Sequence, residues 1–203
     1  MLVVITGRKG GVGKSVVALH LAAALSDLMG RTALVDLDQA NATILDYRDA
    51  GLPLTITNAD GWDAGLNREP WGAVVVDTYA RPNRAQLDEL AALADLLVLP
   101  TNANADSLRV LARTLPDVRA SGANYRVLLN AVPPRPSRAL DLARRDLAAG
   151  GVPMFDTFIP RRAAFDRAAR SLSLAWNVPG GRQLELTFDS LAREVVAHAQ
   201  AEA

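Results

Sequence analysis

The sequence predicts a single α/β domain built on a mostly parallel, twisted sheet with helices on both faces. Short apolar runs recur along the chain with helical patterns between them, which is typical of a parallel sheet covered on both sides. Half of the 203 residues are hydrophobic, enough for a substantial core, and no repeat, low-complexity segment or linker divides the chain. A glycine-rich segment at 7–15 lies between the first apolar run and the first helical pattern.

The elements follow in chain order from these patterns. We expect one domain over residues 1–203 without an N-terminal helix-turn-helix, because the glycine-rich segment begins at residue 7 and leaves no room ahead of it. Apolar runs predict strands at 2–5, 32–35, 54–57, 73–76, 96–99, 126–129 and 154–159. Helical periodicity predicts helices near 14–29, 42–50, 84–93, 106–121, 137–149, 162–171 and 184–201.

Composition excludes several classes of function. The absence of cysteine removes disulfides, thiolate metal sites and iron–sulfur clusters. His20 and His198 have no acidic or histidine neighbours at ligand spacing, so neither is expected to bind a metal. The formal net charge is zero, so any contact with nucleic acid must come from a local patch. No apolar stretch is long enough to span a membrane, and the N-terminal apolar run is too short for a signal peptide. We therefore expect a cytoplasmic protein.

The glycine-rich segment carries both lysines of a chain whose other basic residues are all arginine. A compact ammonium can enter a tight loop and contact phosphate oxygens where a planar guanidinium would crowd the backbone. In such a loop the backbone N–H groups approach phosphate, Lys14 would contact the β- and γ-phosphates, and the Ser15 hydroxyl would bind Mg²⁺. The alternative is a glycine-rich turn with two solvated lysines. The predicted nucleotide-binding residues of this loop are Gly10, Gly11, Val12, Gly13, Lys14, Ser15 and Val16.

The pattern Lys-Gly-Gly-x-Gly-Lys-Ser resembles the deviant Walker A loop of the ParA/MinD family of dimerising ATPases. An ordinary P-loop has glycine six residues before its lysine, whereas this chain has Arg8. The resemblance implies a P-loop NTPase fold, ATP and Mg²⁺ as cofactors, slow hydrolysis and a homodimer that forms when ATP is bound. It also implies that Lys9 reaches across the dimer interface to the partner's nucleotide, which would make Lys9 catalytic together with Lys14.

Two carboxylates close the second expected strand. Asp36 and Asp38 lie two residues apart, so strand alternation points both to one side, at the carboxyl edge where open α/β sheets bind ligands. The family pattern is Asp-x-Asp-Pro-Gln, which this chain matches except for the missing proline. The resemblance implies that Asp38 positions the attacking water and that Asp36 supports the Mg²⁺ shell. A pair of aspartates that caps a turn is the alternative.

A third carboxylate, Asp77, follows the apolar run at 73–76, as in a Walker B strand. Asp77 would hold Mg²⁺ through water, while Thr78 and the following loop would sense the γ-phosphate. The family commonly continues Thr-Pro-Pro here, whereas this chain has Thr-Tyr-Ala-Arg-Pro, which leaves the stiffness of the loop open. A helix cap is the alternative interpretation of Asp77. With Ser15 and Asp36, it completes the predicted metal site.

Two more residues are predicted at the nucleotide. Asn130 follows the strand expected at 126–129, and an amide can both donate to and accept from the N6 and N7 groups of adenine. The alternative for Asn130 is a turn-forming asparagine. The Ile-Pro-Arg stretch at 159–161 resembles a segment near the nucleotide and the dimer interface in the ParA/MinD family, which brings Arg161 to the site.

Arginines concentrate at 135–170, with a local excess of four positive charges over aspartates. Such a surface could neutralise DNA phosphates without reading sequence, although a general arginine-rich surface is an equal alternative. The stretch at 187–191 is not basic, and the last helix lacks the lysine-rich face with which MinD-type proteins lie on membranes. The arginines in question are Arg135, Arg138, Arg144, Arg145, Arg161, Arg162, Arg167 and Arg170.

The sequence therefore favours a ParA-like ATPase that dimerises with ATP, binds DNA non-specifically and partitions plasmid or chromosomal DNA. Its expected partners are a second copy of the chain, non-specific DNA and a small centromere-binding protein of the ParB type, and it would lie on the nucleoid when ATP is bound. One alternative is a positioning ATPase for a protein assembly. Another is a metabolic ATP-dependent ligase or kinase, against which Lys9 counts because such enzymes need no lysine from a second chain.

Overall fold

The computed structural model describes residues 1–38, 43–63, 70–133 and 138–201, and within them six parallel strands form one sheet. The strand order is β3-β2-β4-β1-β5-β6, with β1 in the interior of the sheet between β4 and β5. The predicted α/β class with a parallel sheet is confirmed. The strands are β1 (Leu2–Ile5), β2 (Thr32–Asp36), β3 (Thr55–Asn58), β4 (Ala73–Asp77), β5 (Leu96–Asn102) and β6 (Tyr125–Asn130).

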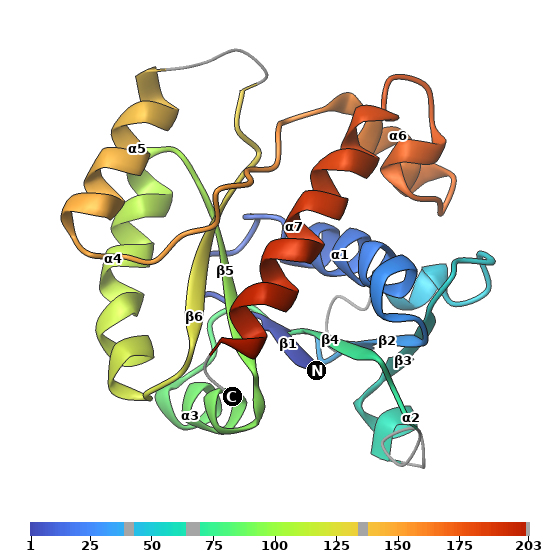
Figure 1. Ribbon diagram of the computed structural model, residues 1–203, viewed down its shortest axis with the longest axis horizontal. Helices are drawn as coiled ribbons and strands as arrows, with labels where there is room; N and C mark the ends of the chain where they lie inside the picture. The colour runs from blue at the N-terminus through green and yellow to red at the C-terminus, as the bar shows by residue number, and fades with distance from the viewer. Residues whose placement is uncertain (39–42, 64–69, 134–137, 202–203) are drawn as a thin grey trace.

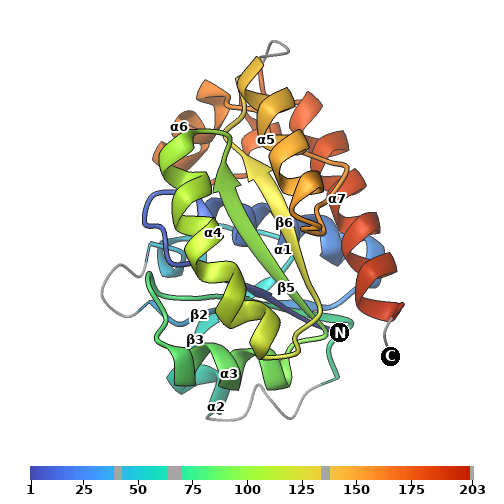
Figure 2. The ribbon, with the colours of Figure 1, turned by 90° about the vertical axis from the view of Figure 1, so that its left-hand side faces the viewer.

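Helices cover both faces of this sheet (Figure 1). On one face α1 (Lys14–Met29) and α7 (Gln183–Gln200) pack against each other and against the sheet. On the other face lie α3 (Arg84–Leu93), α4 (Ala105–Ala120) and α5 (Arg138–Ala149), and Figure 2 shows α4 and α5 in front of β5 and β6. The shorter elements are η1 (Leu45–Tyr47), α2 (Ala59–Asp63), α6 (Ala163–Arg170) and η3 (Ala175–Asn177).

The two faces have separate hydrophobic cores, and β1 contributes to both. Val3 and Ile5 belong to the core under α1 and α7, whereas Val4 belongs to the core under α3, α4 and α5. This division follows from the two-residue period of a strand, and it explains why the run Leu-Val-Val-Ile is apolar at every position. Because β1 is packed on both sides, its position is well fixed, and so is the start of the loop that follows it.

The strand predicted at 154–159 is wrong. The segment runs beside β6 but forms only isolated bridges, at Met154 and at Pro160. Between these bridges the backbone N–H groups of Asp156 and Thr157 donate to the carboxylate of Glu194 on α7, at 2.7 and 2.9 Å. The N–H groups of Phe155 and Ile159 still donate to β6, at the carbonyl oxygens of Val127 and Leu129, but the N–H of Thr157, which a continuous strand would direct to β6, binds a side chain.

The helix predicted at 42–50 is also wrong over the part that the structure describes. Only the single 3₁₀ turn η1 forms there, with three-residue bonds such as Tyr47 N–H to the Ile44 carbonyl oxygen at 3.0 Å. Gly51, with φ of +70°, follows closely and ends the turn. Conversely, α2 was not predicted, because Gly61 lies within it; Asn58 stabilises its start by accepting from the Gly61 N–H at 3.0 Å.

The remaining predicted helices agree with the structure to within one or two residues, except that residue 137 lies outside the described residues. The first residue already takes part in the sheet, because the N–H of Val74 in β4 donates to the Met1 carbonyl oxygen at 2.8 Å. None of the described helices is both long enough and apolar enough to cross a membrane.

Candidate nucleotide site

The predicted site residues meet at the carboxyl edge of the sheet, where β1, β2 and β4 end side by side. Ile5 of β1 and Asp36 of β2 both pair in register with Asp77 of β4. The glycine-rich loop follows β1, so it begins directly beside the two carboxylates. Open α/β sheets bind ligands at this edge, near the strand where the connections change direction. The register alone therefore brings the loop, Asp36 and Asp77 together.

The loop ends at the N-terminus of α1. Gly13 occupies the N-cap position with φ of +84°, and no side chain caps the helix. The N–H groups of the first turn are therefore free of a side-chain partner and face the loop, as they must if phosphate is to bind there. Lys14 is the first residue of α1 and is buried, which fixes its position beside the carboxylates.

Asp77 is the most perturbed acid at this edge. It is 1% exposed, and its Oδ1 has no hydrogen-bond partner within the part of the chain that the structure describes. Burial raises the pKa of Asp77 to about 7; the Ser15 hydroxyl and Lys14 lower it, and the charges of Asp36 and Asp38 raise it. A buried carboxylate with an unsatisfied oxygen is destabilised when charged, and a nearby cation would remove that penalty.

Asp36 is buried on the neighbouring strand, 3% exposed. Burial raises its pKa, and the Asp38 N–H, which donates to Asp36 Oδ1 at 2.9 Å, opposes that effect. The bond also turns the chain at the end of β2 and keeps Asp38 close to Asp36. The consequence of the missing proline concerns residues 39–42, which lie outside the described residues.

These residues fit a magnesium ion held together with phosphates. Among the described residues, no group of three or more His, Cys, Asp or Glu side chains is arranged to hold a metal alone. Mg²⁺ typically keeps several waters and binds through one or two carboxylates plus substrate phosphates. The unpartnered Oδ1 of Asp77, the adjacent Ser15 hydroxyl and the nearby Asp36 are donors of that kind.

A cavity of about 620 Å³ opens beside the loop, between the ends of β5 and β6 and the start of α6. Asn130 lies at its back, 6% exposed, and its amide Nδ2 donates to the Val12 carbonyl oxygen at 2.6 Å. Its Oδ1 accepts from the Ala131 N–H at 2.8 Å. The side chain therefore holds the loop, while its role toward adenine stays a prediction. The cavity is lined by Gly11, Val12, Gly13, Val16, Asn102, Asn130, Ala131, Pro160, Arg161, Arg162, Ala163, Phe165 and Asp166.

The two lysines of the loop differ in burial. Lys9 is half-buried and borders a hollow of about 420 Å³ with Gly10, Gly11 and the start of α4, including Asn104. Lys14 is buried at the other end of the loop. Neither lysine lines the cavity that contains Asn130, and the action of Lys9 on the nucleotide of a second chain stays a prediction.

The site contains one residue that the sequence analysis missed, Asn102 at the end of β5. It pairs in register with Asn130, lines both the cavity and the hollow beside Lys9, and has a buried Oδ1 without a partner. The expected strand stopped at 99 because Pro100 follows, and proline is rare inside a sheet. Extending that strand would have placed two asparagines at adjacent strand ends.

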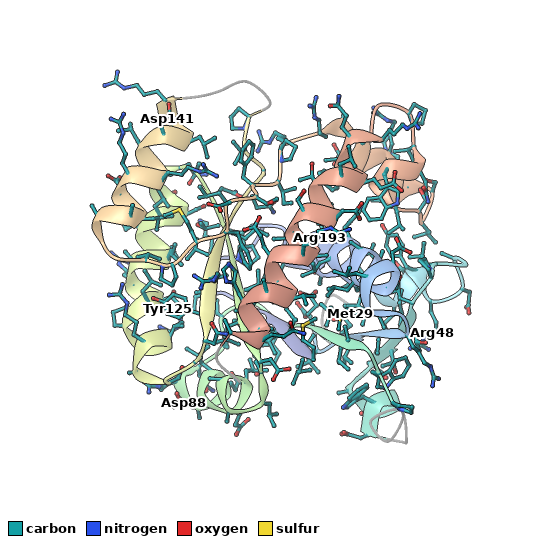
Figure 3. The ribbon with its side chains drawn as sticks, viewed as in Figure 1. Met29, Arg48, Asp88, Tyr125, Asp141 and Arg193 are labelled. Carbon is teal, nitrogen blue, oxygen red and sulfur yellow. The ribbon has the colours of Figure 1, made fainter. Side chains whose placement is uncertain are left out.

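The arginines of 135–170 do not form one uniform surface. Arg144 is half-buried, donating from Nη2 to the Asp156 carbonyl oxygen at 2.5 Å with its guanidinium 5.7 Å from the centre of the Phe158 ring. Arg167 is exposed and donates to the Pro179 carbonyl oxygen at 2.6 Å. Arg135 lies outside the described residues. Figure 3 labels Asp141 in the first turn of α5, where it offsets part of the charge of that helix end.

Comparison with known proteins gives one matching family model and related structures. The model of the CobQ/CobB/MinD/ParA nucleotide binding domain matches residues 3–174. Maintenance of carboxysome distribution protein A from Gloeobacter kilaueensis is 35% identical over 209 residues, which cover 96% of this chain and 93% of that protein. The match to this relative therefore extends over nearly the whole of both chains.

Two solved structures share the fold at lower identity. McdA from Cyanothece, in the ATP complex of a variant, has a TM-score of 0.71 and 16% identity, covering 97% of this chain and 96% of that one. A plasmid partition protein from Borrelia burgdorferi, bound to AMPPNP, has a TM-score of 0.70 and 15% identity, covering 95% and 98%. At this identity the likeness supports the fold.

Proposed function

The chain belongs to the CobQ/CobB/MinD/ParA family of nucleotide-binding domains and is an ATPase that uses ATP and Mg²⁺; we propose that it positions a protein assembly in the cell. The observation that carries this proposal is the match to the carboxysome distribution protein over almost the full length of both chains. Of the two main hypotheses from the sequence, a positioning ATPase for a protein assembly is thus favoured over DNA partition.

The residues of the site divide into binding and catalytic roles in this proposal. The uncapped N-terminus of α1 and Lys14 bind the phosphates, with Ser15, Asp36 and Asp77 as the residues that would hold Mg²⁺. The bound ion would neutralise phosphate charge as the terminal phosphate is transferred to water. Asp38, held beside Asp36, orients that water.

Self-association couples this chemistry to positioning. In the proposal two ATP-bound chains pair through the face that contains Lys9, and each Lys9 reaches the nucleotide of the other chain. Hydrolysis then returns the chains to the unpaired state. Lys9 is half-buried beside an open hollow, whereas Lys14 is buried beside the carboxylates, and this difference supports separate roles for the two lysines.

The cargo is tested in the source cells. We expect that replacing the gene by its Lys14→Ala form leaves fluorescently labelled carboxysome-type assemblies clustered instead of evenly spaced, while plasmid retention is unchanged. The Asp27→Asn form, changed at an exposed side chain in the last turn of α1, is the control and should keep normal spacing. Normal spacing in the Lys14→Ala cells, together with accelerated plasmid loss, would refute the protein-assembly proposal.

Partition of DNA is the second candidate, and the exposed arginines of α5 favour it. Arg138 and Arg145 are exposed on this helix, whereas Arg144 is engaged within the fold. In this case the ATP-bound chain binds unrelated duplexes equally, and its affinity falls with salt by a logarithmic slope of about −0.9 per phosphate contact.

The arginine variants test that candidate directly. Replacing Arg138 and Arg145 together by Glu should weaken binding to all duplexes, whereas Arg113→Glu on α4 serves as a control outside the arginine-rich segment. Binding is measured with ATP, with ADP and without nucleotide across a salt series. No binding in any state at low salt would remove DNA from the function of this chain.

A further inference from the structure

A single carboxylate, Asp117 on α4, joins the glycine-rich loop to the loop that follows β4. Its Oδ2 lies 2.6 Å from Nη2 of Arg8, and its Oδ1 lies 3.5 Å from Nη1 of Arg84. Arg8 directly precedes Lys9, and Arg84 is the first residue of α3. Figure 2 shows α3 beside the lower end of α4. The carboxylate of Asp117 thus pairs with arginines from two segments that are far apart in the sequence.

Arg8 also contacts the second loop directly. Its Nε donates to the Pro82 carbonyl oxygen at 3.4 Å, within the 78–83 segment expected to sense the γ-phosphate. That segment is held at its start by the Thr78 hydroxyl, which donates to the Ile5 carbonyl oxygen at 3.1 Å. At its end Asn83 caps α3 by accepting from the Gln86 N–H at 3.0 Å.

Between these fixed ends the loop has a sparsely populated backbone conformation. Arg81 has φ of +62°, a value that few residues other than glycine adopt. Strain of this kind persists only where the surroundings hold the backbone. The contact of Arg8 with the carbonyl oxygen of Pro82, the residue after Arg81, is such a restraint. The position of the Arg8 side chain and the conformation of the strained turn therefore depend on each other.

The side chain at position 8 is essential to this arrangement. An ordinary P-loop has glycine there, and glycine could form neither contact. Arg8, Lys9 and Gly7 line a small hollow against α4, beside Val110 and Thr114. The Arg8 side chain is therefore directed toward α4, and the half-buried Lys9 that follows it borders this hollow and the one beside Asn104.

We propose that Asp117 is a positioning residue that, through Arg8 and Arg84, presents Lys9 to the partner's nucleotide and ties this lysine to the 78–83 loop. The inference rests on the proposed function, because it requires two ATP-bound chains to pair. The bridge is about one-third exposed, with side-chain exposures of 29% for Arg8 and 32% for Asp117. Ion pairs this accessible add little to folding stability. We therefore expect loss of the Asp117 charge to affect the ATP-bound pair of chains and not the stability of the monomer.

The test compares Asp117 with an aspartate remote from both loops. Asp117→Asn keeps the shape of the side chain and removes its charge. Asp27→Asn does the same at an exposed aspartate in the last turn of α1, at the opposite end of that helix from the glycine-rich loop. With ATP and Mg²⁺, we expect Asp117→Asn to weaken self-association and lower kcat roughly fivefold, with ATP affinity of the dilute monomer and Tm unchanged. Asp27→Asn should match the wild type, and Asp117→Glu should recover part of the loss.

A second readout needs no pairing. Lys9 and Lys14 are the only lysines, so amine labelling followed by mass spectrometry reports the exposure of Lys9 in the monomer without interference from other side chains. We expect Asp117→Asn to raise the labelling rate of Lys9 about twofold relative to Asp27→Asn, with Lys14 unchanged.

The outcomes separate this inference from the proposed function. Equal self-association, kcat and Lys9 labelling in the two variants would overturn the role of Asp117 while the function stands. A parallel fall in monomer ATP affinity and Tm would make Asp117 a structural residue and overturn the inference as well. A wild type that stays monomeric with ATP would overturn the proposed pairing, and the labelling result would then show whether the bridge still orients Lys9.

Discussion

Asn130 donates from Nδ2 to the carbonyl oxygen of Val12 at 2.6 Å, and this bond fastens the glycine-rich loop to the end of β6. The two residues are 118 positions apart in the chain. The same amide lies where a side chain on Gly13 would have to be, 2.5 Å from the Cβ that alanine would add. The loop conformation therefore depends on a strand end that is remote in sequence.

Removing this amide should weaken nucleotide binding. Asn130→Ala leaves the Val12 carbonyl oxygen without its buried donor, at a cost of about 1–3 kcal/mol, so ATP affinity is expected to fall roughly tenfold. Asn124→Ala is the matched control, since its amide binds carbonyl oxygens of Asp95 and His198 at the opposite end of the sheet. Calorimetric titration should find ATP affinity unchanged in the control; an equal affinity in both variants would contradict the role of Asn130.

Gly13 should tolerate alanine worse than a glycine with the same backbone requirement. Gly13 and Gly122 have φ of +84° and +71°, but only Gly13 has an atom within 4 Å of the added Cβ. Gly122→Ala should therefore lose about 1 kcal/mol of stability from φ alone, and Gly13→Ala should lose at least ~2 kcal/mol together with most ATP binding. Denaturant unfolding measures the loss of stability in each variant. Equal losses would show that the contact with Asn130 yields easily.

His20 should make the stability of the fold depend on pH. Its Nδ1 donates to the Val16 carbonyl oxygen at 2.7 Å, its Nε2 accepts from the Ala175 N–H at 2.9 Å, and rings of Phe165 and Phe188 lie 5.2 Å away. Burial lowers the pKa of His20 from 6.5 to about 4. Between pH 6.5 and pH 4, His20 is therefore protonated in the unfolded chain and neutral in the folded one. The contribution of neutral His20 to the free energy of unfolding is complete above pH 6.5 and is lost as the pH falls toward 4.

The size of that loss is measurable by difference. Between pH 6.5 and 4 the wild type should lose roughly 3 kcal/mol more than His20→Gln, which has no titrating group at this position. Asp77, whose pKa is raised to about 7, contributes in the opposite direction in both proteins and cancels. Urea unfolding at a series of pH values gives the difference, and identical pH dependence in both proteins would contradict a buried neutral His20.

Asp38 should separate hydrolysis from binding. Asp38→Ala removes the group proposed to orient water but leaves the loop, Lys14 and the Asp36–Asp77 pair in place. ATP affinity should stay within about twofold while kcat falls on the order of a hundredfold, and the ATP-bound pair should persist longer. Phosphate release measures turnover. A wild-type rate in Asp38→Ala would show that the chain without the family's proline uses another residue.

The sequence was sufficient for most of the fold and for the centre of the site. Apolar runs gave six strands, and the spacing of Lys14, Asp36 and Asp77 relative to three strand ends placed them at one edge, because parallel strands end together. Such information is local, and it needs no knowledge of distant contacts.

The features that the sequence did not reveal depend on contacts between remote segments. Glu194 binds the backbone of 156–157 and prevents a seventh strand, although its own helix was predicted correctly. Asn102 was hidden behind Pro100, which sits inside β5 despite its missing N–H. The Arg8–Asp117 bridge spans more than a hundred residues, so neither partner carries a recognisable signal in its own neighbourhood.

Lys14 is proposed to bind the nucleotide of its own chain and Lys9 to act on that of a partner, so comparison of Lys9→Ala with Lys14→Ala separates the two roles. Sedimentation with ATP and Mg²⁺, alongside ATP titration of the dilute protein, measures pairing and binding separately. We expect Lys9→Ala to bind ATP as a monomer but fail to pair, whereas Lys14→Ala should lose at least about tenfold in ATP affinity. Normal pairing and turnover in Lys9→Ala would rule out the role of Lys9 across two chains.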